Sequence, residues 1–356
     1  MSSKPRNEIL GTCITELPPC CLRISPQDNS VIVVGTYKLE EEGTRHGSID
    51  IYKYSNDVSS NYNLKLLSKI DTESAVLDIK FHNFDPSLLA LSHSTGNVVL
   101  WKFDIEQKTL DKLTNIKIGE LDCLVTSVFF SPVESDRLVA TTTFGNVFSI
   151  DLSDFSISRM EKAHELECWT ASFGELGQLS NVVYSGGDDG KLIAHDLRTR
   201  QEIWSTSHQH HQAGVVSILS PGSGWNTHNP NQLWTGSYDD NLRILDLRLP
   251  DPETSSLIPG YVPKVIEEKN LGGGVWRLIP SPLVSDNRVL SCCMYDGARI
   301  LDSKGNSIEV DKYFKGEHNS ICYGGDWASN GSLVATCSFY DKVLHLWSPD
   351  EPVIYN

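Results

Sequence analysis

The stretch GNVVLWKF at residues 96–103 decides the fold, because similar turn-and-strand stretches recur along the whole chain. Each opens on a turn residue and continues into a strand in which apolar and polar positions alternate. Successive turns are 45 to 57 residues apart, and they open at Gly47, Gly96, Gly145, Gly190, Asp240, Gly297 and Lys342. Repeats of this length, built from short strands, cannot bury their own faces and must stack on one another.

We predict an all-β fold, a single seven-bladed WD-repeat β-propeller that occupies residues 1–356. The predicted blades cover about residues 18–56, 70–105, 120–153, 164–199, 211–248, 270–303 and 318–349. Before the first blade, EILGTCITEL has strand character but no blade of its own, and the last blade lacks room for a long outer strand. We expect residues 8–17 to pair with the last blade, because this pairing closes the ring and removes two exposed edges.

Composition and charge narrow the class of protein. The chain has 356 residues, a net charge of −16 and nine cysteines without C-x-x-C spacing. No apolar run approaches the ~18 residues of a membrane span, and MSSKPRNEIL lacks the apolar stretch of a signal peptide. The negative charge disfavours a nucleic-acid backbone as partner, and the cysteines are typical of reduced thiols in the cytosol. We therefore expect a cytoplasmic monomer that has no transmembrane segment and binds no nucleic acid.

A pattern of histidine, aspartate and hydroxyl residues recurs in blades 4, 5 and 7. His164, His211 and His318 precede inner strands, whereas Asp189, Asp239, Asp296 and Asp341 precede turns, and Ser185 and Thr235 stand on second strands. On paper such a set resembles a hydrolase triad, but in a WD ring it forms a buried hydrogen-bond network that holds the turns. The HQHH run at residues 208–211 lacks neighbouring cysteine or carboxylate ligands, so we predict no metal site.

Aromatic residues are expected to gather at one mouth of the central channel. The candidates are Trp169, Trp276, Tyr238, Tyr295, Tyr323 and Tyr340. Exposed aromatic rings usually mark a site, although ordinary packing against loops is the alternative. Such rings, with carboxylates beside them, suit a quaternary ammonium group through cation–π attraction. No G-x-S-x-G, P-loop, H-E-x-x-H or G-x-G-x-x-G motif occurs in a fitting context, and we predict no cofactor.

Several stretches of blades 4 to 7 resemble the diphthine methylesterase family, the WD-repeat protein of diphthamide biosynthesis. They are HELECW at residues 164–169, YSGGDDGKL at 184–192, GSYDDNLRILDLR at 236–248, GGGVWR at 272–277, HNSICYGGDW at 318–327 and CSFYDKVLHLW at 337–347. The resemblance implies hydrolysis of the methyl ester of methylated diphthine, a modified histidine of translation elongation factor 2. This substrate carries a trimethylammonium group beside the ester, in agreement with the aromatic mouth.

Ester hydrolysis needs a proton acceptor and a group that stabilises an oxyanion. Glu167 and Asp188 are the candidates for activating water, and Arg277 is the candidate for holding the oxyanion or a substrate carboxylate. His318 could act as a base for Ser320, or it could belong to the network with Asp341. The carboxylates could instead only attract a cationic substrate, and a non-catalytic WD-repeat scaffold for protein complexes is the rival function.

Overall fold

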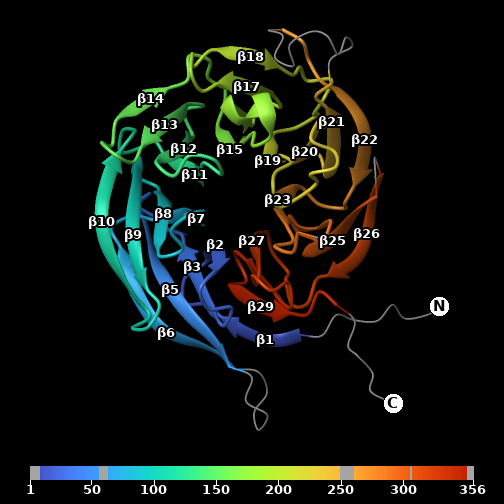
Figure 1. Cartoon of the computed structure of the whole chain (residues 1–356). Coiled ribbons are helices and arrows are strands. Elements are labelled where there is room, and N and C mark those ends of the chain that lie inside the picture. Colours follow the sequence, from blue (N-terminus) through green and yellow to red (C-terminus); the bar gives the residue numbers. More distant parts are fainter. Residues whose placement is uncertain (1–8, 56–62, 249–259, 285, 305–306, 351–356) are drawn as a thin grey trace, which may run out of the picture.

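The computed structural model describes residues 9–55, 63–248, 260–284, 286–304 and 307–350, and it shows seven antiparallel sheets arranged as a ring (Figure 1). Each sheet is one blade of a β-propeller, so the predicted fold class is confirmed. Residues 109–117 form a strand at the outside of the ring and expose most of their side chains, whereas the strand at residues 31–36, which lies between two others, is buried throughout. Within the described ranges, no helix has the length and apolar character needed to cross a membrane.

Every blade consists of an inner, a second, a third and an outer strand. The inner strands are β2 (Pro19–Ile24), β7 (Val76–Phe81), β11 (Val125–Phe130), β15 (Cys168–Phe173), β19 (Val215–Leu219), β23 (Val275–Pro280) and β27 (Cys322–Trp327). The second strands are β3 (Val31–Thr36), β8 (Leu88–His93), β12 (Arg137–Thr142), β16 (Val182–Gly187), β20 (Gln232–Ser237), β24 (Arg288–Cys293) and β28 (Val334–Ser338).

The outer half of each blade is completed by the two remaining strands. The third strands are β5 (Arg45–Ser55), β9 (Asn97–Asp104), β13 (Val147–Asp151), β17 (Leu192–Asp196), β21 (Asn241–Asp246), β25 (Ala298–Lys304) and β29 (Val343–Trp347). The outer strands are β6 (Asn63–Thr72), β10 (Thr109–Lys117), β14 (Ile157–Arg159), β18 (Glu202–Ser205), β22 (Lys264–Asn270), β26 (Ser307–Phe314) and β1 (Ile9–Ile14). A short strand, β4 (Lys38–Leu39), pairs with β5, and a 3-10 turn, η1 (Gly177–Asn181), precedes β16.

The outer strands lie largely in segments that the predicted boundaries leave between blades. Residues 109–117 and 264–269, for example, belong to no predicted blade, yet they form β10 and nearly all of β22. These strands face solvent on most of their length, as the exposure of β10 shows. Because the outer strands have only a weak apolar pattern in the sequence, the predicted blade boundaries leave them out.

The ring is closed by the N-terminal strand, as predicted. β1 pairs antiparallel with β29, from Ile9 opposite Trp347 to Ile14 opposite Val343. The backbone N–H of Thr15 also donates to the Lys342 carbonyl, at 2.9 Å. The first and last parts of the chain therefore share blade 7.

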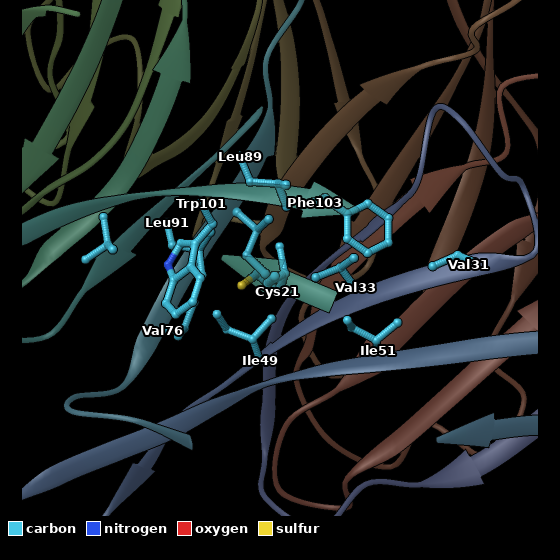
Figure 2. Close-up of a cluster of buried hydrophobic side chains, with 13 residues drawn as sticks. Cys21, Val31, Val33, Ile49, Ile51, Val76, Leu89, Leu91, Trp101 and Phe103 are labelled. Atoms are coloured by element: carbon cyan, nitrogen blue, oxygen red, sulfur yellow. The ribbon is translucent and has the colours of Figure 1, made fainter. Parts of the chain in front are cut away.

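The hydrophobic core lies between blades rather than inside one of them. In Figure 2, Val33 and Ile49 of blade 1 pack in one buried cluster with Val76, Leu91 and Trp101 of blade 2. Further clusters of this kind join the other blades. Since each blade buries its faces against its neighbours, we expect a single blade not to be stable alone.

Six of the seven residues from which the repeat was predicted lie in turns between second and third strands and have a left-handed backbone, whereas the seventh, Gly47, lies within β5. Positive φ angles of 59° to 75° occur at Gly96, Gly145, Gly190, Asp240, Gly297 and Lys342. Glycine adopts this conformation without steric cost, which explains why it recurs at this point in the sequence.

Candidate functional site

A β-bulge is repeated at the start of every inner strand. In all seven pairs of inner and second strands, the register shifts between the first and third residues of the inner strand. The second residue is left out of the ladder, and a bulge re-aims such a side chain. These bulge positions are Cys20, Leu77, Thr126, Trp169, Val216, Trp276 and Tyr323. The aromatic ones belong to blades 4, 6 and 7.

A second set of seven residues lies at the same end of the ring. The residue that follows each second strand donates its backbone N–H to the carbonyl directly before the inner strand of its blade, at 2.8–3.0 Å. These residues are Tyr37, Ser94, Thr143, Asp188, Tyr238, Met294 and Phe339. We call them mouth positions, and we call this end of the ring, where the inner strands begin, the mouth.

Bulge and mouth positions from several blades meet in a continuous row of aromatic rings. Trp276 lies at its middle, with ring centroids 4.8 Å from Tyr323, 5.8 Å from Tyr238 and 6.0 Å from Trp169. Tyr323 in turn lies 5.4 Å from Phe339.

Phe339 connects this row with two further rings, those of Tyr340 at 5.0 Å and Tyr37 at 6.0 Å. We define the aromatic arc as Tyr37, Trp169, Tyr238, Trp276, Tyr323, Phe339 and Tyr340. It contains five of the six predicted substrate-binding residues, namely Trp169, Tyr238, Trp276, Tyr323 and Tyr340. Phe339 and Tyr37 were missed by the sequence analysis, although both directly follow a second strand and could have been found by aligning the ends of those strands.

The predicted alignment is one residue off in blades 6 and 7. The positions equivalent to Asp188 and Tyr238 are Met294 and Phe339, not Tyr295 and Tyr340. In blade 7 the turn is one residue longer, which places Tyr340 beyond the mouth position with 70% of its surface exposed. Tyr295 is 64% exposed and has a φ of 62°, and no ring contact joins it to the arc among the described residues.

Two carboxylates stand beside the arc in blade 4. The Trp169 indole N–H donates to Asp188 Oδ1 at 3.0 Å, which orients the ring. Gly214 allows this packing, because a Cβ there would lie 2.7 Å from Asp188 Oδ1 and 3.0 Å from a Tyr238 ring carbon. The Glu167 carboxylate is half-buried and has no hydrogen-bond or ion-pair partner among the described side chains.

The electrostatics of the mouth are negative. Burial and the Tyr323 hydroxyl raise the pKa of Tyr238. The charges of Asp188 and Glu167 add to this rise, which places both carboxylates near the Tyr238 ring. Tyr238 therefore stays a neutral phenol at physiological pH, and the nearby negative charge favours a cationic ligand.

Arg277 follows the bulge residue Trp276 and makes its contacts with an inner strand across the ring and with the backbone of blade 7. Its Nη2 lies 3.2 Å from Asp78 Oδ1, and its Nε donates to the Tyr323 carbonyl at 3.3 Å. Burial is the largest single effect and acts to lower the pKa of Arg277, but the charge of Asp78 and the nearby cysteines Cys20, Cys21 and Cys292 together raise that pKa. The guanidinium is thus a permanent cation directly behind the arc.

His318 does not reach the mouth. It is fully buried, its Nδ1 lies 2.7 Å from Ser338 Oγ, and its Nε2 lies 2.8 Å from Thr336 Oγ1. The expected partner Asp341 instead accepts the backbone N–H of Asn319, and Ser320 Oγ accepts that of Tyr340. Burial lowers the pKa of His318 to about 3, and its contacts are those of an architectural residue.

The network predicted in blade 4 is present in full. His164 lies 2.9 Å from both Asp189 Oδ1 and Ser185 Oγ, and Ser185 reaches His195 at 2.8 Å. In blade 5, His211 meets Thr235 at 2.9 Å, whereas Asp239 pairs with Arg243. The described residues hold no group of three or more metal-ligating side chains.

Comparison with known proteins gives close relatives along nearly the whole chain. The diphthine methyltransferase of Saccharomyces cerevisiae is 39% identical over 98% of this chain and 100% of its own length. That of Schizosaccharomyces pombe is 35% identical over 95% of this chain and 96% of its own. A chain of the mitotic checkpoint complex crystal structure superposes with a TM-score of 0.70 at 16% identity, covering 98% of this chain and 93% of that one, and shows the fold alone. No family model matches the chain.

These relatives correct one part of the sequence analysis. Their name describes methyl transfer, so the predictions of methyl-ester hydrolysis and of a carboxylic ester hydrolase are wrong, whereas those of an enzyme and of diphthamide biosynthesis are supported. With 39% identity over nearly its full length, the chain belongs to the diphthine methyltransferase family.

Proposed function

We propose that this chain acts in diphthamide biosynthesis, where it binds the diphthine side chain of translation elongation factor 2 and takes part in the methylation chemistry that its relatives' name describes. The observation that carries the proposal is the aromatic arc, which joins rings from five blades at one end of the propeller. The name of the relatives supplies diphthine, and the arc supplies a surface suited to a quaternary ammonium group.

The chemistry of the mouth supports a cationic ligand in two ways. Aromatic faces attract a desolvated cation by roughly 0.5–2 kcal/mol each. Glu167 and Asp188 add negative charge beside the arc, and Asp188 also fixes the plane of Trp169 through its indole N–H. In this proposal, the two carboxylates attract and orient the substrate.

The alternative function is a non-catalytic scaffold. One observation favours a protein-binding surface at the mouth. Exposed apolar side chains stand within a few residues of a mouth position or of the start of an inner strand in several blades: Leu39, Leu121, Phe144, Leu166 and Tyr340. A folded protein substrate and a scaffold partner would both need such a surface. Only a measurement of enzymatic activity therefore distinguishes the proposed function from a scaffold.

The test uses elongation factor 2 purified from cells with and without this chain. We expect the number of methyl groups on its diphthine residue, read by mass spectrometry, to differ between the two sources. We also expect added wild-type protein to restore the normal state, and Glu167→Gln with Asp188→Asn to do so more slowly. Arg198→Met, a surface variant outside the mouth, serves as control.

Identical methylation in the two sources, with no change on addition of the protein, overturns the proposed activity. If the chain then still binds the modified factor more tightly than the unmodified one, it is a scaffold that recognises diphthine. Cell fractionation tests the proposed cytoplasmic location in the same strains, since elongation factor 2 is the expected substrate there.

A further inference from the structure

A cluster of five charged side chains lies on the inner strands one layer behind the aromatic arc. Asp78 and Arg277 occupy the third residue of β7 and β23, and Arg23, Lys80 and Asp326 occupy the fifth residue of β2, β7 and β27. We call these five residues the charged floor.

The charged floor is held together by ion pairs, one of which crosses the ring. Lys80 Nζ lies 2.7 and 2.6 Å from the two oxygens of Asp78, and Arg277 Nη2 lies 3.2 Å from the same carboxylate. Arg23 Nη1 lies 3.8 Å from Asp326. Because Asp78 belongs to blade 2 and Arg277 to blade 6, the pair joins blades that are not neighbours.

The floor has one cation more than it has carboxylates. Its three basic side chains share two acidic ones, and the exposed fraction is 1% for Asp78 and 14–16% for the other four side chains. Burial, and then the charge of Arg23, lowers the pKa of Lys80 to about 7 although Asp78 acts in the opposite direction. Lys80 is therefore about half protonated near pH 7, and an anion bound in this layer would favour its charged form.

The floor and the arc are in direct contact. The Arg277 guanidinium carbon lies 6.0 Å from the Trp276 ring centroid, and Arg277 Nε donates to the carbonyl of Tyr323. An anion at Arg277 is therefore close to a cation that rests on the rings of these two residues.

We propose that the charged floor binds the carboxylate of a ligand whose quaternary ammonium group rests on the aromatic arc. The site would thus select betaine-type groups, in which one short carbon link joins the two charges, over quaternary ammonium groups alone. The inference rests on the proposed function and deepens it, since it assigns Arg277 and Lys80 to the substrate's carboxyl group. Asp78 is then the internal carboxylate that holds both cations until the ligand competes for them.

The alternative is that the charged floor only stabilises the fold, as a structural brace between blades. The two roles predict different effects of a substitution at Asp78. If the floor binds ligand, Asp78→Asn removes a competitor and strengthens the binding of a carboxylate. If the floor is only a brace, the same variant weakens the fold and leaves ligand preference unchanged.

The experiment compares two small probes that differ in one group. Glycine betaine carries a trimethylammonium group and a carboxylate, whereas choline carries the same cation and a hydroxyl. Charge-assisted hydrogen bonds are strong enough that we expect the full-length protein to bind glycine betaine roughly 10-fold more tightly than choline, as measured by NMR titration. Arg277→Met and Lys80→Met should each reduce this preference, Asp78→Asn should increase it, and Arg198→Met should leave it unchanged.

Three outcomes overturn the inference. Equal binding of the two probes by the wild type removes the carboxylate site but leaves the arc and the proposed function intact. An unchanged preference in Asp78→Asn identifies the floor as a brace. If neither probe binds, the inference fails, and the methylation state of elongation factor 2 decides separately on the proposed function. Thermal unfolding of each variant identifies any that fail to fold. If Arg277→Met is among them, the probe preferences of Lys80→Met and Asp78→Asn test the inference in its place.

Discussion

Trp276 and Tyr340 belong to the same aromatic arc but have different surroundings. Trp276 packs against Tyr323, Tyr238 and Trp169 and is half-buried, whereas Tyr340 contacts Phe339 and is 70% exposed. Trp276 thus both holds the neighbouring rings in place and presents a face to a ligand, whereas Tyr340 mainly presents a face to a ligand.

We predict that Tyr340→Leu weakens binding of diphthine-bearing elongation factor 2 by about 2- to 30-fold, the range of one cation–π contact. Its free energy of unfolding should stay within about 0.5 kcal/mol of the wild type, because the side chain is exposed. Calorimetric binding and urea unfolding measure the two quantities. The control is Phe84→Leu, an exposed aromatic at the opposite end of an inner strand, and a matching loss of binding there would contradict the prediction.

Tyr295 has a backbone conformation that bulky residues rarely adopt. Its φ is 62°, which costs roughly 1–2 kcal/mol for an L-residue, and asparagine tolerates this region better. We expect Tyr295→Asn to raise the free energy of unfolding by about 0.5–1 kcal/mol and to weaken binding of the modified factor.

The matched control is Phe155→Asn, since Phe155 is also an exposed aromatic at positive φ but lies on the outer loop between β13 and β14. It should gain stability without any change in binding. If Tyr295→Asn behaves in the same way, Tyr295 plays no part in recognition.

The aromatic part of the site could be predicted because its residues follow a repeat. Trp169, Trp276 and Tyr323 share the second position of an inner strand, and this position is visible once the repeat is aligned. Phe339 was missed because the extra turn residue of blade 7 shifts the alignment by one. Asp78, which pairs with Arg277, was missed because a contact across the ring leaves no trace in any local pattern.

Among the strands, β1 has the most individual role. It supplies the outer strand of blade 7, and Leu10 and Cys13 pack against the cluster that joins blades 7 and 1. Thr12 Oγ1 also reaches His345 Nδ1 at 2.8 Å.

We predict that deletion of residues 1–17 leaves β29 unpaired and uncovers this cluster, so that the protein aggregates or unfolds without cooperativity. Deletion of residues 1–8, which precede β1, is the control and should leave the melting curve unchanged. Light scattering and thermal unfolding measure both effects. A monomeric protein with wild-type melting after the longer deletion would show that closure does not depend on β1.

Inner and second strands were easier to predict than outer strands. An inner strand such as β11 is buried along most of its length and has a strong apolar pattern. An outer strand such as β22 (KVIEEKN) is exposed or half-buried at every position, and its pairing with β21 rather than its composition makes it a strand. Tertiary pairing overrides local preference at such edges.

The whole ring contains several histidines that fold in the neutral state. Burial lowers the pKa of His195, His211 and His318 from 6.5 to about 3. The unfolded chain takes up protons below pH 6.5 and the folded chain does not, so stability from these residues is present above pH 6.5 and is lost as the pH falls. His164 acts in the opposite sense, because burial would lower its pKa but Cys168 and Asp189 raise it to about 9. Its contribution to the free energy of unfolding is therefore complete below pH 6.5 and declines as the pH rises towards 9.

We predict a loss of up to about 2 kcal/mol per neutral histidine between pH 6.5 and pH 5. Urea unfolding at the two pH values measures the loss. His318→Gln should show a smaller pH dependence than the wild type. A wild-type stability that is the same at both pH values would contradict this account.

The pairing of β1 with β29 also determines how the ring responds to force. Ile9 lies opposite Trp347, so the chain enters and leaves blade 7 at the same end of an antiparallel pair. Tension between a point before Ile9 and a point after Trp347 therefore loads the hydrogen bonds of this pair one after another, as in a zipper, rather than all together in shear. No covalent turn joins these two strands, unlike the other pairs within a blade. When a fused tether pulls on both ends, the propeller opens at this seam before any blade loses its second strand.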